Sequence, residues 1–132
     1  MMDAVDRLIA ERACEQLIID YAALVDAARW DSVAALYSAN GRMSRPTSPD
    51  DFIEGQHAIL ASFLARPPRK TRHISANIRV TVESTTRATA LSQILLFTGA
   101  DQSPLVGSYA DILLNEGDGW RFLERRGSLD FT

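Results

Sequence analysis

The sequence predicts an α+β fold in which helices come first and pack on one face of an antiparallel sheet. Apolar residues recur at spacings of three and four in the N-terminal part, which is typical of amphipathic helices. The C-terminal part contains β-rich runs joined by connections of hairpin length, and such connections imply antiparallel neighbours. The chain has 132 residues, so we expect one domain over residues 1–132 with a substantial buried core.

The N-terminal part is expected to form two helices followed by a loop. The first helix covers residues 3–28, and its apolar stripe is centred near Tyr21. The second begins near Asp31, and Asn40-Gly41 is expected to end it because both residues tolerate a left-handed backbone. The segment "RMSRPTSPDDF" is predicted to be a loop with a few strand residues on either side, since prolines and small polar residues mark turns.

The remaining chain is predicted to be one helix and then strands. A third helix covers residues 55–65, and Pro67-Pro68 stops it. The turn "EGDG" carries the Asp-Gly signal of a hairpin. Four strands are expected, at residues 71–83, 87–98, 105–115 and 120–130.

Composition excludes several classes of function. The net charge of −3 argues against non-specific nucleic-acid binding, which requires clustered positive charge. Arg66, Arg69, Lys70 and Arg72 form a local basic cluster that we interpret as a solvated linker. The single cysteine, Cys14, excludes an intrachain disulfide. The N-terminus has no uninterrupted apolar run for a signal peptide or a membrane span, so we expect a cytoplasmic protein without membrane association.

The stretch "TRHISANIRV" carries the strongest candidate for chemistry, because His73 starts the polar face of a predicted strand. Histidine suits the role of a general base, since its ordinary pKa is near neutral. Such a base needs a carboxylate to orient it. The residues alone favour an exposed or structural histidine and leave the general base as the alternative. The candidate carboxylates are Asp20, Asp26, Asp31, Asp101 and Asp111.

Two further expectations concern the helical carboxylate and the cofactors. On a helical wheel Asp26 lies far from the apolar stripe, so the wheel predicts that it faces solvent. His57 and His73 lack a regular metal-ligand spacing, and no glycine-rich loop joins a strand to a helix. We therefore expect no metal and no cofactor.

Four ordered segments carry a resemblance to a known family. They are "YAALVDAARWDSVAALYSANGRM", "GQHAILASFL", "TRHISANIRV" and "GSYADILLNEGDGWRFLERR". Together they resemble the SnoaL-like, scytalone dehydratase-like branch of the nuclear transport factor 2-like superfamily. The resemblance implies a cone-shaped curled antiparallel sheet packed on the N-terminal helices, a cystatin-like α+β barrel, with a pocket between sheet and helices.

The resemblance also implies a set of site residues. Asp26 and His73 fall at the positions of a catalytic Asp-His dyad, in which the histidine takes a proton from carbon. Tyr21 and Arg125 fall at or near polar pocket positions. Thr71, Ser75 and Tyr109 are the remaining expected substrate-binding residues.

The function implied by the resemblance is a cofactor-independent lyase. It would perform a dehydratase-type β-elimination on a small, mostly apolar substrate, cyclic compounds included. An isomerase or hydrolase that uses the same dyad stays open, as does a non-catalytic ligand-binding or oligomerisation module. Ser44 and Arg45 stand where ketosteroid isomerases carry a general-base aspartate, which argues against that particular mechanism. Relatives of this kind are often oligomers, so we expect a homodimer or a homotrimer.

Overall fold

The computed structural model describes residues 2–131, which form three helices and six strands. The helices are α1 (Ala4–Asp26), α2 (Trp30–Ala35) and α3 (Gln56–Leu64). The strands are β1 (Tyr37–Arg45), β2 (Ser48–Glu54), β3 (Arg72–Val82), β4 (Arg87–Phe97), β5 (Leu105–Asn115) and β6 (Trp120–Leu129). No helix in this described part of the chain combines the length and the apolar character needed to cross a membrane.

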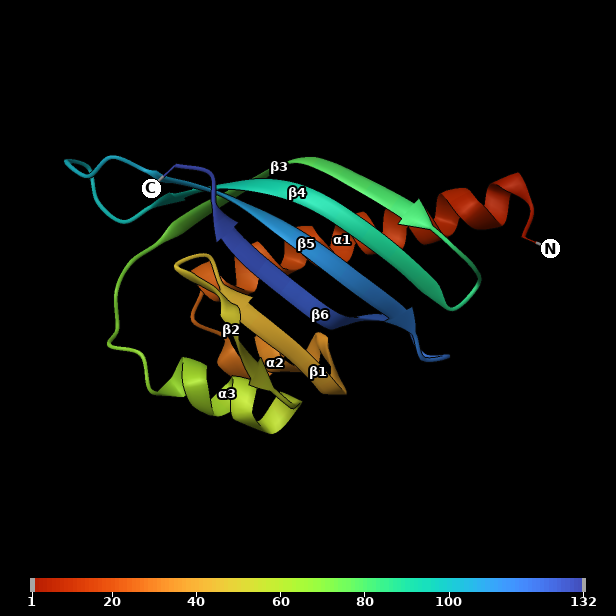
Figure 1. Cartoon of the computed structure of the whole chain (residues 1–132), viewed down its shortest axis with the longest axis horizontal. Coiled ribbons are helices and arrows are strands. Elements are labelled where there is room, and N and C mark those ends of the chain that lie inside the picture. Colours follow the sequence, from red (N-terminus) through yellow and green to blue (C-terminus); the bar gives the residue numbers. More distant parts are fainter. Residues whose placement is uncertain (1, 132) are drawn as a thin grey trace.

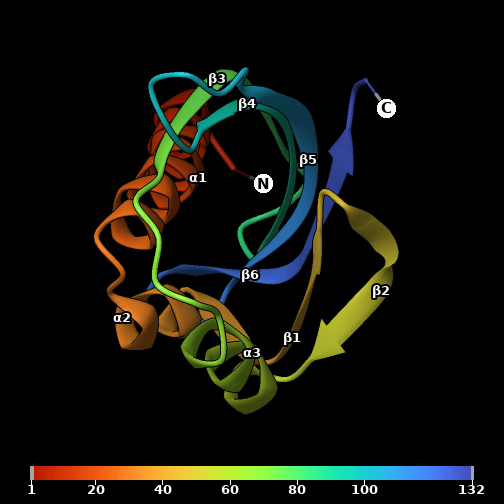
Figure 2. The same ribbon diagram turned by 90° about the vertical axis from the view of Figure 1, so that its left-hand side faces the viewer.

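The six strands form one curled sheet in the order β2-β1-β6-β5-β4-β3. The neighbours from β3 to β6 pair antiparallel, as hairpin connections require. β1 is antiparallel to β2 but parallel to β6, so the sheet as a whole is mixed. Figure 2 shows that the sheet curves around the helices without closing into a barrel. The predicted α+β class, with a curled sheet packed on the N-terminal helices, is confirmed.

The core lies between α1 and the concave side of the sheet, and Figure 1 shows α1 running behind β3 to β6. The C-terminal part of the stripe that the spacing predicts on α1 is buried there, including Leu17, Ile18 and Tyr21. Its N-terminal part, Val5, Leu8 and Ile9, is exposed. The ring of Tyr21 meets Phe122 of β6 edge-to-face, with 5.5 Å between the ring centroids. Tyr37 of β1 joins the same aromatic cluster. Such aromatic contacts fix α1 against the sheet in addition to the apolar area they bury.

The second helix is shorter than predicted, because Asn40-Gly41 does not end it. Both residues lie within β1, at an irregularity of its pairing with β6. A Cβ atom on Gly41 would stand 2.8 Å from the carbonyl oxygen of Phe122. Glycine is therefore needed at position 41 because a side chain there would collide with β6. It does not form the left-handed end of a helix.

The segment predicted to be mostly loop forms most of the β1–β2 hairpin instead. β1 and β2 are joined by a short turn at Pro46-Thr47. Pro49 lies within β2, and β2 is an edge of the sheet, where a missing N–H donor is tolerated. Turn-forming composition was thus misleading for an edge hairpin.

A β-bulge in β3 changes which residues face the helices. Ala76 pairs with Gln93 but Arg79 pairs with Leu91, so β3 has one extra residue, and Asn77 takes a positive φ of 52°. Before the bulge, His73 and Ser75 are half-buried while Ile74 between them is exposed. After it, the half-buried positions are Ile78 and Val80. Strict alternation along the sequence therefore does not give the side chains that face the helices, because the bulge inverts it.

Candidate functional site

The site is built around a carboxylate at the end of α1 and a histidine at the start of β3. The Nδ1 atom of His73 lies 2.6 Å from Oδ1 of Asp26, and the backbone N–H of His73 donates to Oδ2 at 2.9 Å. The Thr71 hydroxyl donates to Oδ1 at 2.9 Å. Because a carboxylate only accepts, Nδ1 is assigned the proton and Nε2 carries the lone pair. The geometry thus fits a histidine that is oriented to accept a proton at Nε2.

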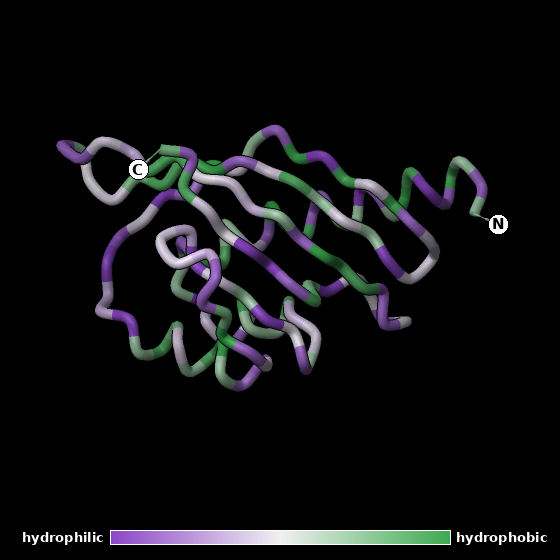
Figure 3. The backbone as a smooth tube through the Cα atoms, viewed as in Figure 1, coloured by the Kyte–Doolittle hydropathy of each residue, from purple (hydrophilic) through white to green (hydrophobic). Residues whose placement is uncertain are grey.

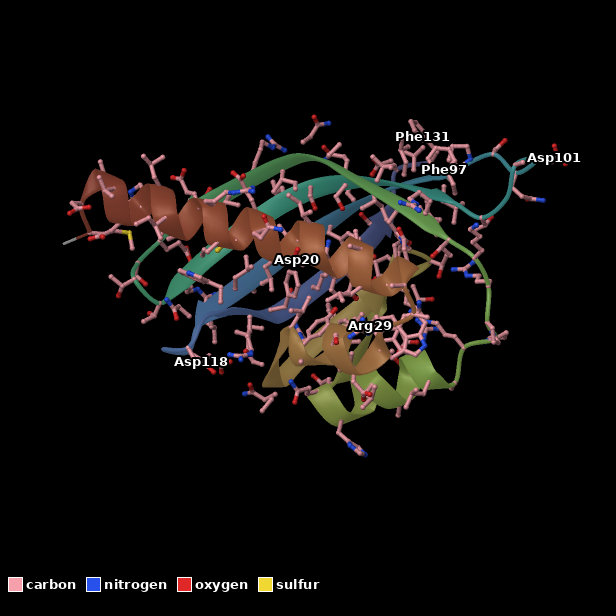
Figure 4. All side chains as sticks on the ribbon, turned by 180° about the vertical axis from the view of Figure 1, so that it is seen from behind. Asp20, Arg29, Phe97, Asp101, Asp118 and Phe131 are labelled. Atoms are coloured by element: carbon pink, nitrogen blue, oxygen red, sulfur yellow. The ribbon has the colours of Figure 1, made fainter. Side chains whose placement is uncertain are left out.

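The solvent-facing expectation for Asp26 is wrong. Its side chain is only 10% exposed, because β3 passes beside the end of α1 and covers it. Of the other candidate carboxylates, Asp20 points outward from α1 and Asp101 lies on the distant β4–β5 loop (Figure 4). Asp31 is exposed and Asp111 is buried elsewhere. A helical wheel describes only the residues of the helix itself. It therefore cannot predict that Asp26 is buried by a strand that lies far along the chain.

Local backbone geometry places Asp26 at the end of the helix. Ala28 adopts a positive φ of 56°, and the N–H of Arg29 donates to the carbonyl of Leu24 at 3.0 Å. These are features of a helix that ends through a left-handed residue. A carboxylate at this position meets the negative end of the helix dipole, which is unfavourable. The hydrogen-bond donors of Thr71 and His73 offset that cost.

A cavity of about 240 Å³ opens beside the His73 ring. A cavity of roughly 150 Å³ can hold benzene, so this one has room for a small ring compound. Thr71 and His73, both predicted, lie on its wall. Its lining residues are Val25, Ala28, Trp30, Leu64, Arg66, Pro67, Pro68, Arg69, Thr71 and His73.

The other predicted site residues gather behind the histidine, around a space of only about 10 Å³. That is close to the volume that a single water needs, and much less than an organic substrate requires. The structure therefore brings the other five predicted residues near the Asp26–His73 dyad but separates them into two groups. Those around the small space are Tyr21, Ser75, Tyr109 and Arg125.

Arg125 is the charged centre of the second group and is 1% exposed. Its guanidinium lies 3.9 Å from the ring centroid of Tyr109 and 4.5 Å from that of Tyr21. Its Nε atom is 3.6 Å from Oδ1 of Asp111. Burial raises the pKa of the Asp111 carboxyl to about 6 although Arg125 pulls it down, and burial raises the pKa of Tyr109 to about 12. A buried positive charge with aromatic neighbours thus stands on the far side of His73.

The connection between α3 and β3 supplies wall residues that the sequence did not identify. It is the hydrophilic segment drawn in purple on the left of Figure 3, and we interpreted its arginines as a solvated linker. Lys70 and Arg72 are indeed exposed, but Arg66 is half-buried and both Arg66 and Arg69 line the cavity. The interpretation as a solvated linker is wrong for Arg66, whereas Arg69 is exposed as expected although it also lines the cavity. The Pro67-Pro68 pair between them was a usable signal, because it stiffens the segment beside the site.

Comparisons with known proteins agree with this architecture. The family model described as the SnoaL-like domain matches residues 6–126. The resemblance inferred from the four sequence segments is confirmed by this match. None of the curated proteins matches the chain.

Solved structures share the fold at low sequence identity. A scytalone dehydratase candidate from Novosphingobium aromaticivorans superposes with a TM-score of 0.86 at 23% identity, covering 98% of this chain and 89% of the other. A nuclear transport factor 2-like protein with a cystatin-like fold, from the same organism, gives 0.84 at 20% identity, with coverage of 97% and 87%. A type 2 hexachlorocyclohexane dehydrochlorinase gives 0.85 at 16% identity, with coverage of 98% and 90%. These likenesses establish the nuclear transport factor 2-like fold.

Proposed function

We propose that this chain, which belongs to the SnoaL-like domain family, is a cofactor-independent lyase that performs a β-elimination. The observation that carries the proposal is the 2.6 Å contact between His73 Nδ1 and Asp26 Oδ1 at the wall of a cavity of about 240 Å³. A histidine held in one tautomer by a carboxylate is the arrangement that a general base requires. The size and the largely apolar lining of the cavity suit a small, mostly apolar substrate, cyclic compounds included.

In the proposed reaction, Nε2 of His73 takes a proton from a substrate carbon. The electron pair of the broken C–H bond forms a double bond to the adjacent carbon, and the leaving group departs from that carbon with its own bonding pair. The products are an alkene and the leaving group. The imidazolium gives its proton to a departing hydroxide, which forms water, or to solvent where the leaving group is a stable anion such as chloride. Asp26 stabilises the imidazolium, and such a base contributes roughly 10²–10⁴ in rate.

The remaining site residues have supporting roles in this proposal. Thr71 orients the carboxylate of Asp26 by its hydrogen bond. Arg125 lies behind His73 and does not line the cavity, so it would stabilise the negative charge that develops on the substrate from a distance and not by contact. Tyr109 and Tyr21 hold the guanidinium of Arg125 between their rings, and Ser75 completes the polar wall behind His73.

The fold comparison favours elimination over other uses of the dyad. Two of the structures with this fold are described as a scytalone dehydratase candidate and a hexachlorocyclohexane dehydrochlorinase, both names for elimination chemistry. Isomerisation and hydrolysis can begin with the same base, so they remain alternatives. A non-catalytic binding module is the alternative from another class, and it requires only the cavity.

The chain contains a matched control for the experiment, because it has only two histidines. Wild type, His73→Ala and His57→Ala are incubated with scytalone, hexachlorocyclohexane and a panel of cyclic β-hydroxyketones, and alkene formation is followed. We expect His73→Ala to lose turnover while the exposed His57→Ala retains it. Turnover that survives in a folded His73→Ala variant would contradict the proposed base. Binding of these compounds without any turnover or C–H exchange by wild type would instead support the binding module.

A further inference from the structure

Arginines surround a second cavity that adjoins the one beside His73. This cavity measures about 480 Å³, and Arg45, Arg66 and Arg69 lie on its wall. Arg66 and Arg69 also line the smaller cavity, so segment 66–69 separates the two and belongs to both. Among residues 2–131, no aspartate or glutamate lines either cavity. A molecule that extends from His73 past this segment therefore meets positive charge.

The three arginines lack the acidic partners that other arginines of the protein have. Within residues 2–131, the ion pairs involve seven other arginines and none of these three. The Nε atoms of Arg45 and Arg66 are buried and have no hydrogen-bond partner among the residues that the structure describes. Arg66 is held in place by Phe63, whose ring centroid lies 4.3 Å from its guanidinium carbon. Nη2 of Arg45 donates to the carbonyl oxygen of Ser62 at 3.5 Å. The guanidinium groups of Arg45 and Arg66 are thus positioned without being neutralised.

Charge repulsion makes this arrangement unfavourable on its own. Burial, and then the nearby charge of Arg45, lower the pKa of Arg66. Like charges that are partly removed from water repel more strongly than they do on an exposed surface. A bound anion would relieve this repulsion and give the unpaired N–H groups an acceptor.

We propose that Arg45, Arg66 and Arg69 bind a carboxylate or a phosphate monoester group of the substrate, while its apolar part occupies the cavity beside His73. The planar guanidinium fork suits both groups, because each presents paired oxygens. Trp30 and Leu64 offer the apolar walls for the rest of the molecule. That the bound molecule is a substrate rests on the proposed lyase function. The binding of its anionic group can be tested without any turnover.

The test uses three probes of the same shape and different charge: cyclohexanecarboxylate, cyclohexyl phosphate and the neutral cyclohexanecarboxamide. Their affinities are measured by chemical-shift titration of the ¹⁵N-labelled protein at low ionic strength. We expect at least one anion to bind about tenfold or more tightly than the amide, since hydrogen bonds to charged groups are the stronger ones. Comparing the two anions shows which group the site prefers.

Substitutions test whether the arginines cause the preference for the anionic probes over the amide. Arg66→Gln and Arg45→Gln should reduce it, and Arg66→Lys should keep part of it by retaining the charge. Arg79→Gln removes the same charge from an exposed position on β3 and should leave the preference unchanged. If Arg66→Gln does not fold, the exposed Arg69→Gln serves in its place, again with a reduced preference expected.

Equal binding of anion and amide by wild type, or binding of none of the probes, would overturn the inference. A preference that persists in the folded Arg45 and Arg66 variants would overturn it as well. His73→Ala separates this inference from the proposed function: anion preference should persist in this variant even though turnover is lost. Loss of the preference in His73→Ala would count against the arginine site.

Discussion

At the scale of single residues, the carboxylates of Asp26 and Asp111 differ in the hydrogen bonds that they accept. Asp26 accepts hydrogen bonds from Thr71 and from His73. Both carboxylate oxygens of Asp111 are buried without a hydrogen-bond partner, and Arg125 is its only close counter-charge among the described residues. A buried carboxylate with an incomplete set of donors is expensive to ionise.

This difference predicts a pH dependence of stability. Burial raises the pKa of Asp111 from 3.8 to about 6, so the folded protein holds that proton more tightly than the unfolded chain. Its contribution to stability is present at low pH and is lost as the pH rises from about 4 to about 6. Asp111→Asn does not titrate, so its unfolding free energy relative to wild type should rise through this window by up to about 1.4 kcal/mol per pH unit.

Urea unfolding between about pH 3.5 and about pH 7.5 measures this difference directly. Asp118→Asn is the control, because Arg121 lowers the pKa of the exposed Asp118. The stabilisation from Asp118 is lost only as the pH falls below the ordinary carboxyl pKa of 3.8, so the difference between this variant and wild type should stay nearly constant between about pH 4 and about pH 7.5. If the unfolding free energy of Asp111→Asn relative to wild type does not change between about pH 4 and about pH 6, burial does not raise the pKa of Asp111.

At the scale of secondary-structure elements, the bulge in β3 is what turns both His73 and Ile78 toward the helices. Asn77 makes this possible by adopting a positive φ of 52°. Asparagine tolerates that conformation better than a β-branched residue does. The end of β3 that carries His73 and the end that packs Ile78 toward the helices thus both depend on the bulge at Asn77.

We predict that Asn77→Val lowers the unfolding free energy by about 1–2 kcal/mol, because valine is strained at a left-handed position. Asn77→Gly should be nearly neutral. Thr81→Val on the same strand is the control, since Thr81 is exposed and its φ is not positive, and its effect should stay within about 0.5 kcal/mol. Chemical denaturation measures all three. Equal stabilities for Asn77→Val and Thr81→Val would mean that the bulge does not constrain the residue at position 77.

The elements that the sequence predicts well are those whose partners are local. The ranges of α1, α3 and β5 follow from periodicity and turn residues, and each agrees with the structure within two residues. β1 is different, because it gains its stability by pairing with β6, which lies far along the chain. Its turn-forming residues, including Asn40-Gly41, gave the opposite local signal.

The same distinction separates what could and could not be predicted of the site. The family resemblance singled out Asp26 and His73, whose side chains the structure brings into contact, although the helical wheel placed Asp26 in solvent. Arg66 and Arg69 were missed because their role comes from where the connection between α3 and β3 passes, and no local pattern encodes that path. The bulge at Asn77 was missed for a similar reason, since pairing with β4 defines it.

At the scale of the whole molecule, the outer face of the sheet carries exposed apolar side chains. Ile74, Leu91 and Phe97 are 44%, 48% and 37% exposed, and they come from the neighbouring strands β3 and β4. Exposed apolar groups that gather on one surface often mark an interface. We propose that this face joins copies of the chain in a homodimer or a homotrimer.

Sedimentation velocity at micromolar concentration tests this assembly. We expect wild type to sediment as a dimer or trimer and Leu91→Glu to shift it toward monomer, since the new charge would be buried between subunits. Leu8→Glu is the control, because Leu8 is 63% exposed on α1, away from the sheet face. A monomeric wild type would refute the assembly, and dissociation by Leu8→Glu alone would place the interface on α1.

The proposed reaction requires Asp26 to hold His73 as a base with its lone pair on Nε2, and one measurement tests this without a substrate. ¹⁵N NMR of the imidazole ring at about pH 8 distinguishes the two neutral tautomers. We predict a protonated Nδ1 and an unprotonated Nε2 for His73 in wild type, and loss of this preference in Asp26→Asn. A proton found on Nε2 in wild type would contradict the proposed role of His73 as a base that accepts a proton at this atom.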